Sequence, residues 1–462
     1  MMRRRRLHFR RVLILAASLM TLAGGAHAEP DVQPLSLKEA IQRALAHRPE
    51  LRGAVADVGA AGARLLEARS GYLPTILLQG SATDGPLGAP AFGPLENPGL
   101  FGTQPLSLEG LSADPLKKHY GAGLSLTESI FDFGRTQHLI AARSEQMTAA
   151  RSDQVTAEAD VALSVTQAYF GVLRAARLSR LQESNLTQRE STLKQARAFF
   201  DAKLRSGVDL ELAAANAADA KAAAIAAQGN LKIAFAELNH AMGETGLTEF
   251  RLEEAPTQPL PSPATAEAAM DEAAKHRPEV LGAAALSRAA DQTLRGVESE
   301  LMPRLDAIAS FGAVVPSPLI SANKNYALGL ALTIPIYTGG FVEGRVSEER
   351  EHRHAANARV EAVREAVRLQ AARAFIDVQT REAQVSAARE EVVAGDRSLK
   401  LASERYHLEL GTIVELTEAE TLALAARTRL AEAEYALDLA RAELQWAMGA
   451  RAPMRTPRGE IR

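Results

Sequence analysis

Few side chains in this sequence have the types and spacing that catalysis or metal binding requires. The 462 residues include no cysteine, which excludes thiolate chemistry and disulfides, and contain no G-x-x-x-x-G-K-[ST] phosphate-binding loop. His352 and His354 are two apart on a predicted helix and cannot share a face, so we interpret them as surface residues. Asp132-Phe133-Gly134 matches a kinase triplet without the other kinase motifs, and we interpret it as a strand-to-helix corner. We therefore expect no enzyme activity, no cofactor and no bound metal.

The first 28 residues have the three-part layout of a secretory signal peptide. Arginines at positions 3–6 and 10–11 precede a short apolar stretch, and Ala26-His27-Ala28 supplies a cleavage site. The apolar stretch is shorter than the roughly 20 residues that span a bilayer, so we favour cleavage over a membrane anchor. Removing these six positive charges from the total of −3 leaves −9 on the mature chain. An acidic exported protein is a poor candidate for binding nucleic acid.

The mature sequence contains two copies of one plan. The motif His47-Arg48-Pro49-Glu50 returns as residues 276–279, and the segment YGAGLSLTESIFDFG from Tyr120 returns as YALGLALTIPIYTGG from Tyr326. Each copy predicts two short helices, two strands, a very long helix and a returning helix. We assign repeat 1 to residues 29–255, repeat 2 to residues 256–449, and a disordered tail to residues 450–462.

The helices after the strands are unusually long. Residues 134–203 and 341–409 contain no proline and are rich in alanine, leucine, glutamate and arginine, which favour helices. About 70 residues at 1.5 Å each give a helix of roughly 105 Å. We expect each to turn back at a glycine that takes a left-handed conformation, in the turns at 204–207 and 409–412. Such helices need neighbours on both flanks, as in a barrel of helices.

Two strand pairs are predicted from the alternation of apolar with small or polar residues. They comprise residues 75–83, the segment from Tyr120, residues 304–314 and the segment from Tyr326 to Ile336. A half-buried strand of a soluble sheet would alternate in the same way; the signal peptide and the long helices favour a membrane. Four strands cannot close a barrel, so a channel would need several chains. The residues predicted to face lipid are Tyr120, Leu124, Leu126, Tyr326, Leu328, Leu330, Leu332, Ile334 and Ile336.

The order of these motifs resembles that of the TolC family of outer-membrane efflux proteins. The resemblance is carried by LSLTESIFDFGR and LALTIPIYTGG, by QAYFGVLRA from Gln167 and by GTIVELTEAET from Gly411. It implies a mainly α fold with a small transmembrane β part: a homotrimeric α-helical barrel in the periplasm, continuous with a 12-stranded β-barrel in outer-membrane lipid, to which each chain gives four strands. It also implies a passive exit duct of a tripartite efflux pump or type I secretion system, opened by a periplasmic adaptor (a membrane fusion protein) and an inner-membrane pump, proton-driven or ABC-type.

The same resemblance suggests residues at the periplasmic end. It places acidic side chains around the closed entrance, at Glu211, Glu415 and Glu418, although isolated glutamates are usually solvated charges on a helix face. It implies that the helix tips contact the adaptor. The tip residues are Leu204, Gly207, Val208, Leu410, Gly411 and Thr412.

Several alternatives remain open from the sequence. A periplasmic coiled-coil scaffold or adaptor without a pore would also have long helices, but it would not need the apolar strand face. An exported hydrolase lacks support, because no catalytic arrangement is visible. The proline-rich segment at 83–118 reads as a floppy loop or as an extracellular loop over the pore. The cargo could be a drug, a metal ion or a polypeptide.

Overall fold

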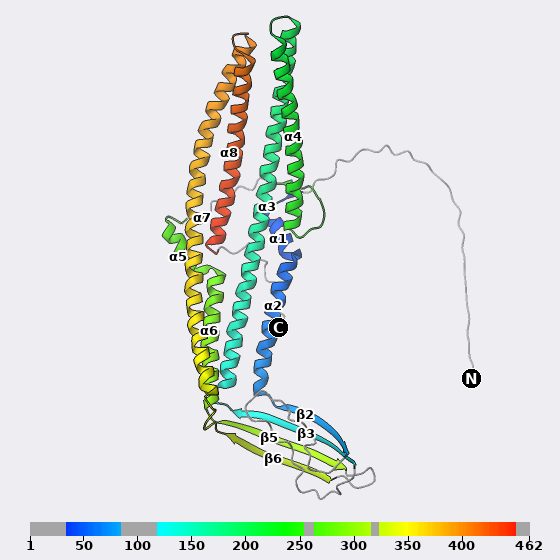
Figure 1. Cartoon of the computed structure of the whole chain (residues 1–462), viewed down its shortest axis with the longest axis vertical. Helices are drawn as coiled ribbons and strands as arrows, with labels where there is room; N and C mark the ends of the chain where they lie inside the picture. The colour runs from blue at the N-terminus through cyan, green and yellow to red at the C-terminus, as the bar shows by residue number, and fades with distance from the viewer. Residues whose placement is uncertain (1–33, 85–117, 254–262, 316–322, 450–462) are drawn as a thin grey trace, which may run out of the picture.

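Two helices of equal length form the framework of the molecule. They are α3 (Arg135–Asp201) and α7 (Phe341–His407), of 67 residues each, and both follow the long axis of the chain (Figure 1). At 1.5 Å per residue each is about 100 Å long. The computed structural model describes residues 34–84, 118–253, 263–315 and 323–449. The predicted signal peptide, residues 85–117 of the predicted loop and the C-terminal tail lie outside these ranges.

The two halves of the chain contain the same series of helices with equal lengths. Helices α1 (Leu37–His47) and α5 (Ala266–His276) have 11 residues each, α2 (Pro49–Arg69) and α6 (Pro278–Glu298) have 21, and α4 (Gly207–Ala241) and α8 (Ile413–Ala447) have 35. Ser36 caps α1 by accepting the Glu39 N–H at 3.3 Å. The prediction of a mainly α fold with a small β part is confirmed.

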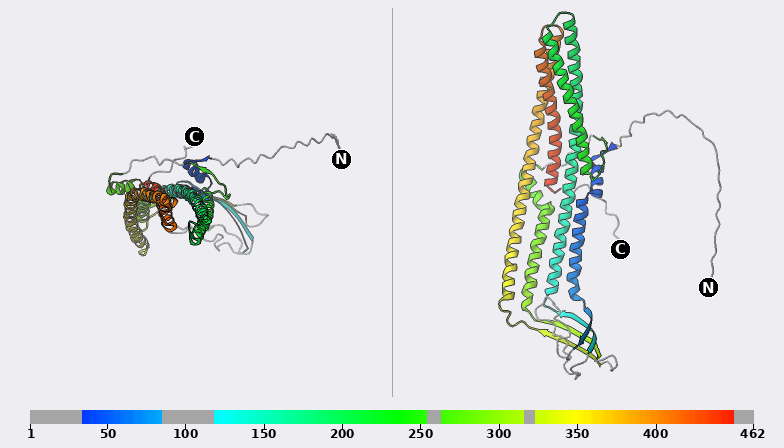
Figure 2. Two further views of the ribbon diagram at one scale, coloured as in Figure 1. Left: turned by 90° about the horizontal axis from the view of Figure 1, so that it is seen from above. Right: turned by 45° about the vertical axis from the view of Figure 1, so that its right-hand side comes forward.

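The helices form four columns side by side in a curved layer. Helix α3 packs against α2 and α4 on one flank and against α6 and α8 on the other, and α7 closes the layer beyond α6 and α8. The first column consists of α2 and α4 placed end to end, and the third of α6 and α8 (Figures 1 and 2). The outer flanks of the α2–α4 column and of α7 have no neighbouring helix among the described residues apart from the short α5.

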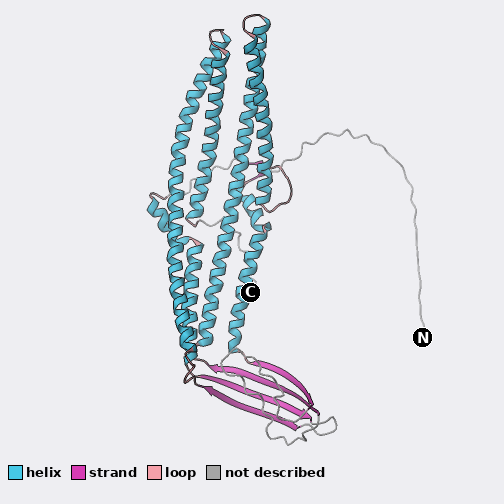
Figure 3. Cartoon of the chain, viewed as in Figure 1, coloured by secondary structure: helices cyan, strands magenta, loops and turns pink. Residues whose placement is uncertain are grey.

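One end of the helical layer continues into a four-stranded antiparallel sheet (Figure 3). Its order is β2–β3–β5–β6, so the two strand pairs lie next to each other and the edges β2 and β6 have no partner in the described chain. The strands are β2 (Thr75–Asp84), β3 (Lys118–Phe131), β5 (Arg304–Val315) and β6 (Asn323–Thr333). None of the helices in the described ranges combines the length and hydrophobicity needed to cross a bilayer.

The register of the sheet separates an apolar face from a face of small and polar residues. Leu124 pairs with Phe311, and Phe311 with Tyr326, so these side chains share one face. The opposite face carries the pairs Ser125–Ser310 and Gly123–Gly312. Members of the apolar face are strongly exposed in the single chain; Leu328 is 84% exposed and Leu330 is 70% exposed.

The second strand of repeat 2 begins and ends three residues earlier than predicted. Strand β6 ends at Thr333, which pairs with Arg304, the first residue of β5. Ile334 and Ile336 are exposed but lie beyond the strand, so their assignment to it was wrong. Pro335 between them has no N–H for the ladder, and β5 offers no further partner.

The predicted corner at Asp132 is confirmed as the start of a long helix. The Asp132 carboxylate accepts the N–H groups of Gly134 at 3.1 Å and Thr136 at 2.8 Å, which caps α3. Gly134 has φ +86° and Gly340, at the start of α7, has φ +81°. Both positions favour glycine because a Cβ is strained in this conformation.

The distal turns do not use glycine in the way that the sequence predicted. The left-handed residues are Lys203 (φ 59°) and Glu409 (φ 60°) rather than Gly207 or Gly411. Each follows a Schellman pattern: the Leu204 N–H bonds to the Phe199 carbonyl, and the Leu410 N–H bonds to the Arg405 carbonyl. Gly207 is instead the first residue of α4. Gly411 is buried, and an added Cβ would lie 3.2 Å from the Arg405 Cβ, so this glycine permits a close approach of the chain.

A short parallel bridge ties the start of the described chain to the connection between the halves. Strand β1 (Pro34–Leu35) pairs with β4 (Arg251–Leu252). The buried hydroxyl of Tyr169 on α3 lies 2.9 Å from the Leu35 carbonyl oxygen and 2.7 Å from that of Glu253. Burial raises the pKa of Tyr169 to about 12.

Candidate functional site at the helix tips

The distal ends of the two hairpins, α3–α4 and α7–α8, bring most of the predicted site residues together. Leu204, Val208 and Leu410 are 53%, 75% and 69% exposed, so the tips present apolar side chains to solvent. Thr412 caps α8 by accepting the Glu415 N–H at 3.1 Å, with its backbone in an extended conformation. The predicted tip residues therefore all lie in or beside the two turns, and Gly411 differs from the exposed ones in being buried.

The three predicted entrance acids are exposed but differ in their surroundings. Glu415 forms an ion pair with Arg405 at 3.1 Å. Glu418 and Glu211 form no ion pair in the part of the chain that the structure describes. Counted from the first residues of α4 and α8, Glu211 corresponds to Thr417 and not to an acid. The counterpart of Glu415 is Asp209, because α4 begins at Gly207 and α8 at Ile413.

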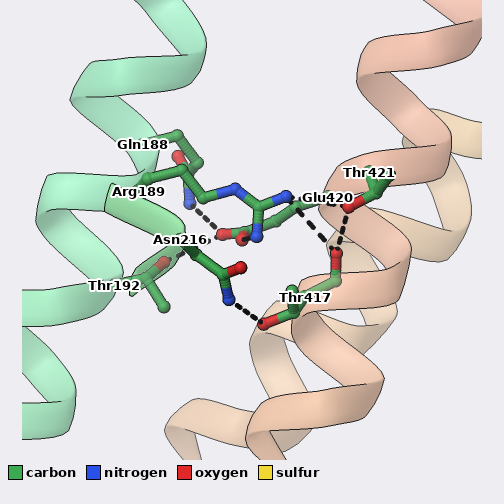
Figure 4. Close-up of polar contacts among 7 residues, drawn as sticks. All are labelled: Gln188, Arg189, Thr192, Asn216, Thr417, Glu420 and Thr421. Atoms are coloured by element: carbon green, nitrogen blue, oxygen red, sulfur yellow. Dashed lines mark hydrogen bonds and ion pairs between the residues drawn. The ribbon is translucent and has the colours of Figure 1, made fainter. Parts of the chain in front are cut away.

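A buried ion pair joins the two hairpins about two helical turns along α8 from its N-terminus. Arg189 on α3 and Glu420 on α8 are 7% and 3% exposed, and Arg189 Nη1 lies 2.7 Å from Glu420 Oε2. Figure 4 shows the two side chains meeting between the helices. Glu420 Oε1 also accepts the Thr192 hydroxyl at 2.8 Å, and Arg189 Nη2 donates to Thr421 Oγ1 at 2.9 Å. The charges are therefore matched by neutral partners as well as by each other.

Sequence reasoning missed this pair, although the sequence contains a signal for it. The buried residues of α8 near its start are Ile413, Leu416, Ala419, Glu420 and Ala423. Their spacing of three and four residues defines an apolar stripe, and Glu420 lies within that stripe. A glutamate on such a stripe requires a buried partner, but the sequence cannot say that the partner is Arg189, 231 positions earlier.

An apolar cluster from all four tip helices surrounds the turns. Tyr406 on α7 is fully buried and packs edge to face against Phe199 on α3, with ring centroids 5.7 Å apart. Arg205 lies with its guanidinium 5.6 Å from the Tyr406 ring centre. Burial raises the pKa of Tyr406, Asp209 raises it further and Arg205 lowers it. The buried members of the cluster are Ala196, Ala213, Ala402, Tyr406, Ile413, Leu416 and Ala419.

Arg205 also links one turn to the other. Its Nη2 donates to the Gly411 carbonyl at 2.6 Å and to the Glu409 carbonyl at 3.3 Å. Gln195 on α3 and His407 on α7 add a contact of 2.6 Å between Nε2 and Nδ1. The turn of the first hairpin is thus bound to the backbone of the second.

The duplicated HRPE motif forms the two joints at which helices stack end to end, α2 on α4 and α6 on α8. Arg48, before α2, donates to the His240 carbonyl at the end of α4 at 3.1 Å and forms an ion pair with Glu50 at 3.2 Å. Arg277 makes the equivalent bond to the Trp446 carbonyl at 3.1 Å. A cation at the carbonyl end of a helix satisfies acceptors that the helix leaves open. The sequence revealed the repeat but not that its arginines join separate helices.

Comparisons with known proteins agree with this architecture. The profile of the family described as Outer membrane efflux protein matches residues 40–244 and 269–450. The chain is 25% identical to the outer membrane protein TolC of Escherichia coli (strain K12) over 418 residues, covering 87% of this chain and 80% of TolC. It is 24% identical to the outer membrane efflux protein BepC of Brucella suis biovar 1 (strain 1330) over 316 residues, covering 68% of each.

A solved structure extends the likeness to three dimensions. The outer membrane protein VceC of Vibrio cholerae matches with a TM-score of 0.74 at 21% identity, covering 89% of this chain and 96% of VceC. The resemblance in fold thus extends over most of both chains. Because the family profile spans most of both halves, this chain belongs to the outer membrane efflux protein family.

Proposed function

We propose that the protein is a passive exit duct through the outer membrane, built from three copies of this chain. The observation that carries the proposal is the open sheet with one apolar face. In lipid, unpaired strand edges and polar backbone groups are not tolerated, so β6 of one chain must pair with β2 of the next. Three chains give twelve strands, above the minimum of about eight for a closed wall. The apolar face then meets lipid and the small, polar face lines the pore.

This proposal predicts opposite effects for charges on the two faces. Leu330→Arg places a cation on the apolar face and should cost about 2–4 kcal/mol near the bilayer centre. It should abolish the heat-modifiable trimer in outer-membrane fractions. Ala331→Arg, on the neighbouring residue of the same strand, faces the other side and should assemble. The proposed duct function is contradicted if both variants form normal trimers, or if the mature wild-type protein is monomeric and water-soluble.

We propose that the exposed apolar tips contact a periplasmic adaptor that connects the duct to an inner-membrane pump, proton-driven or ABC-type. Val208→Asp should reduce co-purification with the adaptor and lower export at least tenfold, with the trimer intact. Leu422→Asp is the control, since Leu422 is 52% exposed on α8 but farther from the tip, and α8 has α3 and α7 as neighbours within the chain. Equal loss from both changes would contradict tip-specific docking.

We propose further that Glu418 and Glu415 form acidic rings at the entrance. Two charges ~6 Å apart repel by roughly 3 kcal/mol at an effective dielectric constant of ~20, so such a ring favours bound cations. Because Arg405 pairs with Glu415, the unpaired Glu418 should dominate. Glu418→Gln should weaken block of single-channel current by divalent cations more than Glu415→Gln. Glu432→Gln, an exposed carboxylate farther along α8, should have no effect. Unchanged block in the Glu415→Gln, Glu418→Gln double variant would disprove the ring.

A further inference from the structure

A cavity of about 760 Å³ lies beside the two joints formed by the HRPE motifs. Its walls come from α2, α3 and α6, and the ends of α1, α5 and α8 contribute the remaining lining. Helices α2 and α6 both pack against α3, so the cavity is contained within one chain. Sites for small molecules typically enclose roughly 300–1,000 Å³. The cavity therefore has the size of a binding site.

The cavity lies on the side of the helical layer that carries α1. Leu45 and Ala46 of α1 line it, and Figure 2 shows α1, in blue, on the convex side of the curved layer. A ring built from several such layers encloses the space on their concave side. A ligand therefore enters this cavity from outside the ring and not from the duct.

Two arginines in the walls have no acidic partner in the part of the chain that the structure describes. Arg52 on α2 and Arg151 on α3 are exposed, and neither forms an ion pair or a side-chain hydrogen bond with another described residue. By contrast, Arg277 pairs with Glu279 at 2.6 Å. The lining has four arginines against two glutamates. The cavity therefore has an excess of positive charge.

A buried nitrogen in the same lining lacks a hydrogen-bond acceptor. Arg48 Nε is buried and makes no hydrogen bond within the described ranges, although a Glu50 oxygen lies 3.2 Å away. Its Nη1 is already used by the His240 carbonyl. Buried N–H groups in proteins are almost always paired. An anion bound beside Arg48 would be a suitable acceptor.

Apolar side chains form much of the remaining wall and are open to solvent. Val55 on α2, Val155 on α3 and Leu281 on α6 are 55%, 40% and 51% exposed. Trp446 adds its ring, which stacks with the Arg277 guanidinium at 4.0 Å. Covering exposed apolar surface with the apolar part of a ligand is favourable in proportion to the area covered.

The C-terminal tail of the chain is a second candidate occupant, because it begins at the edge of the cavity. Gly449 belongs to the lining, and residues 450–462 follow it. The tail contains four arginines and one glutamate, so its charge has the same sign as the excess in the lining. Like charges at close range repel each other. Charge complementarity therefore favours an anion from outside the chain.

We propose that the cavity binds an amphipathic anion, a carboxylate or phosphate carried on a single apolar chain. Arg52 and Arg151 bind the head through charge-assisted hydrogen bonds, and the exposed apolar wall with Trp446 covers the chain. This inference goes beyond the proposed duct function and does not depend on it. Free fatty-acid-like carboxylates and single-chain lipid phosphates share this chemistry, and the test distinguishes them.

The only tryptophan of the protein reports on the cavity directly. Bromine quenches tryptophan fluorescence on contact, so a brominated ligand reveals binding beside Trp446. The 21 residues of α6 separate the joint from the sheet by about 30 Å, so probe dissolved in detergent around the sheet does not reach this ring. The mature protein in a non-ionic maltoside detergent is titrated with ω-bromoundecanoate. In a parallel titration, ω-bromoundecanol has the same apolar chain without the charge.

We expect saturable quenching by ω-bromoundecanoate, half complete at a concentration at least about tenfold below that for ω-bromoundecanol. Unbrominated undecanoate and undecyl phosphate then compete with the probe, and the stronger competitor identifies the preferred head group. Equal quenching by the acid and the alcohol would overturn the anion site. Quenching that is absent, that does not saturate, or that neither competitor reverses would overturn it as well.

Matched variants test the roles of the two arginines. Arg52→Met with Arg151→Met should raise the half-quenching concentration at least about tenfold, and an unchanged value would contradict the proposal. Arg174→Met with Arg177→Met changes two exposed arginines of α3 outside the lining and should leave the value within about twofold. Val155→Glu places a carboxylate four residues after Arg151 and should also weaken binding, whereas the neutral Val155→Gln should weaken it much less.

A variant that ends at Gly449 tests the alternative occupant. Removing residues 450–462 should leave the half-quenching concentration within about twofold, because the basic tail does not fill the cavity. If quenching by ω-bromoundecanoate appears only after this removal, the tail occupies the cavity in the complete chain, and the proposed anion site is wrong.

Discussion

The change Glu420→Leu should loosen the tip of the molecule more than any exposed charge substitution. At 2.7 Å and an effective dielectric constant of ~20, the attraction between Arg189 and Glu420 is roughly 6 kcal/mol before desolvation. Part of this is offset by the burial of both charges, and removing one partner of a buried pair usually costs about 3–5 kcal/mol. Among the described residues, Arg189 would keep its bonds to Thr421 and to the Thr417 carbonyl.

Hydrogen exchange at the tip is the suitable assay, because unfolding of a membrane-embedded oligomer is not a two-state process. Peptides covering residues 185–215 and 400–425 report on local opening. Since each 1.4 kcal/mol is tenfold in an equilibrium constant, a loss of about 3 kcal/mol accelerates exchange there by about 100-fold. Peptides from α2 and α6, at the other end of the helices, should not change.

Two matched variants decide whether the burial of the charge is responsible. Arg189→Met with Glu420→Leu removes both charges and should return exchange to within tenfold of wild type. Glu434→Leu breaks the exposed Arg389–Glu434 pair at 3.3 Å, whose side chains are 65% and 44% exposed, and should change exchange less than about fivefold. The reasoning is refuted if Glu420→Leu also stays within fivefold, or if the double change is worse than the single one.

Three further predictions concern the arginines of the two HRPE motifs, the glycine that follows α8, and the buried hydroxyl of Tyr169. Arg277→Met should cost about 2–3 kcal/mol and Arg48→Met about 1, because Arg277 is more buried and stacks 4.0 Å from the Trp446 ring centre. Hydrogen exchange of peptides covering residues 236–243 and 442–449 reports the two losses, and equal acceleration in both variants would contradict the idea. Gly449→Ala should cost about 1–3 kcal/mol, since φ is +81° and a Cβ would lie 2.9 Å from the His276 carbonyl carbon. Gly229→Ala, with open space around it, should be neutral or stabilising, and hydrogen exchange of peptides covering each site compares the two. Burial holds the pKa of Tyr169 at about 12 against an ordinary 10.0, so its contribution to stability is full below pH 10 and falls by about 1.4 kcal/mol per pH unit between pH 10 and about 12. Tyr169→Phe should lack this component, and identical alkaline stability curves for the two proteins would count against it.

The sequence by itself determined the elements and their order. The HRPE and strand motifs appear twice, and the unbroken runs at 134–203 and 341–409 correspond to helices that begin and end within two residues of those limits. The alternation in the strands predicted their faces correctly in the described part, since Leu124 and Leu328 lie on one face of the sheet. These features depend on local periodicity, which is defined by residues that are neighbours in the sequence.

Only the tertiary structure decided how distant residues meet. The turn position was assigned to glycine, but Schellman bonds hold Lys203 and Glu409 in the left-handed conformation, and a hydrogen-bond pattern can override the preference of a single residue. Strand β6 ends at Thr333 because its partner begins at Arg304, which the strand's own sequence does not encode. The Arg189–Glu420 pair and the Arg277–Trp446 bond join residues far apart in the chain, so their partners are set by how the helical columns pack and not by any local pattern.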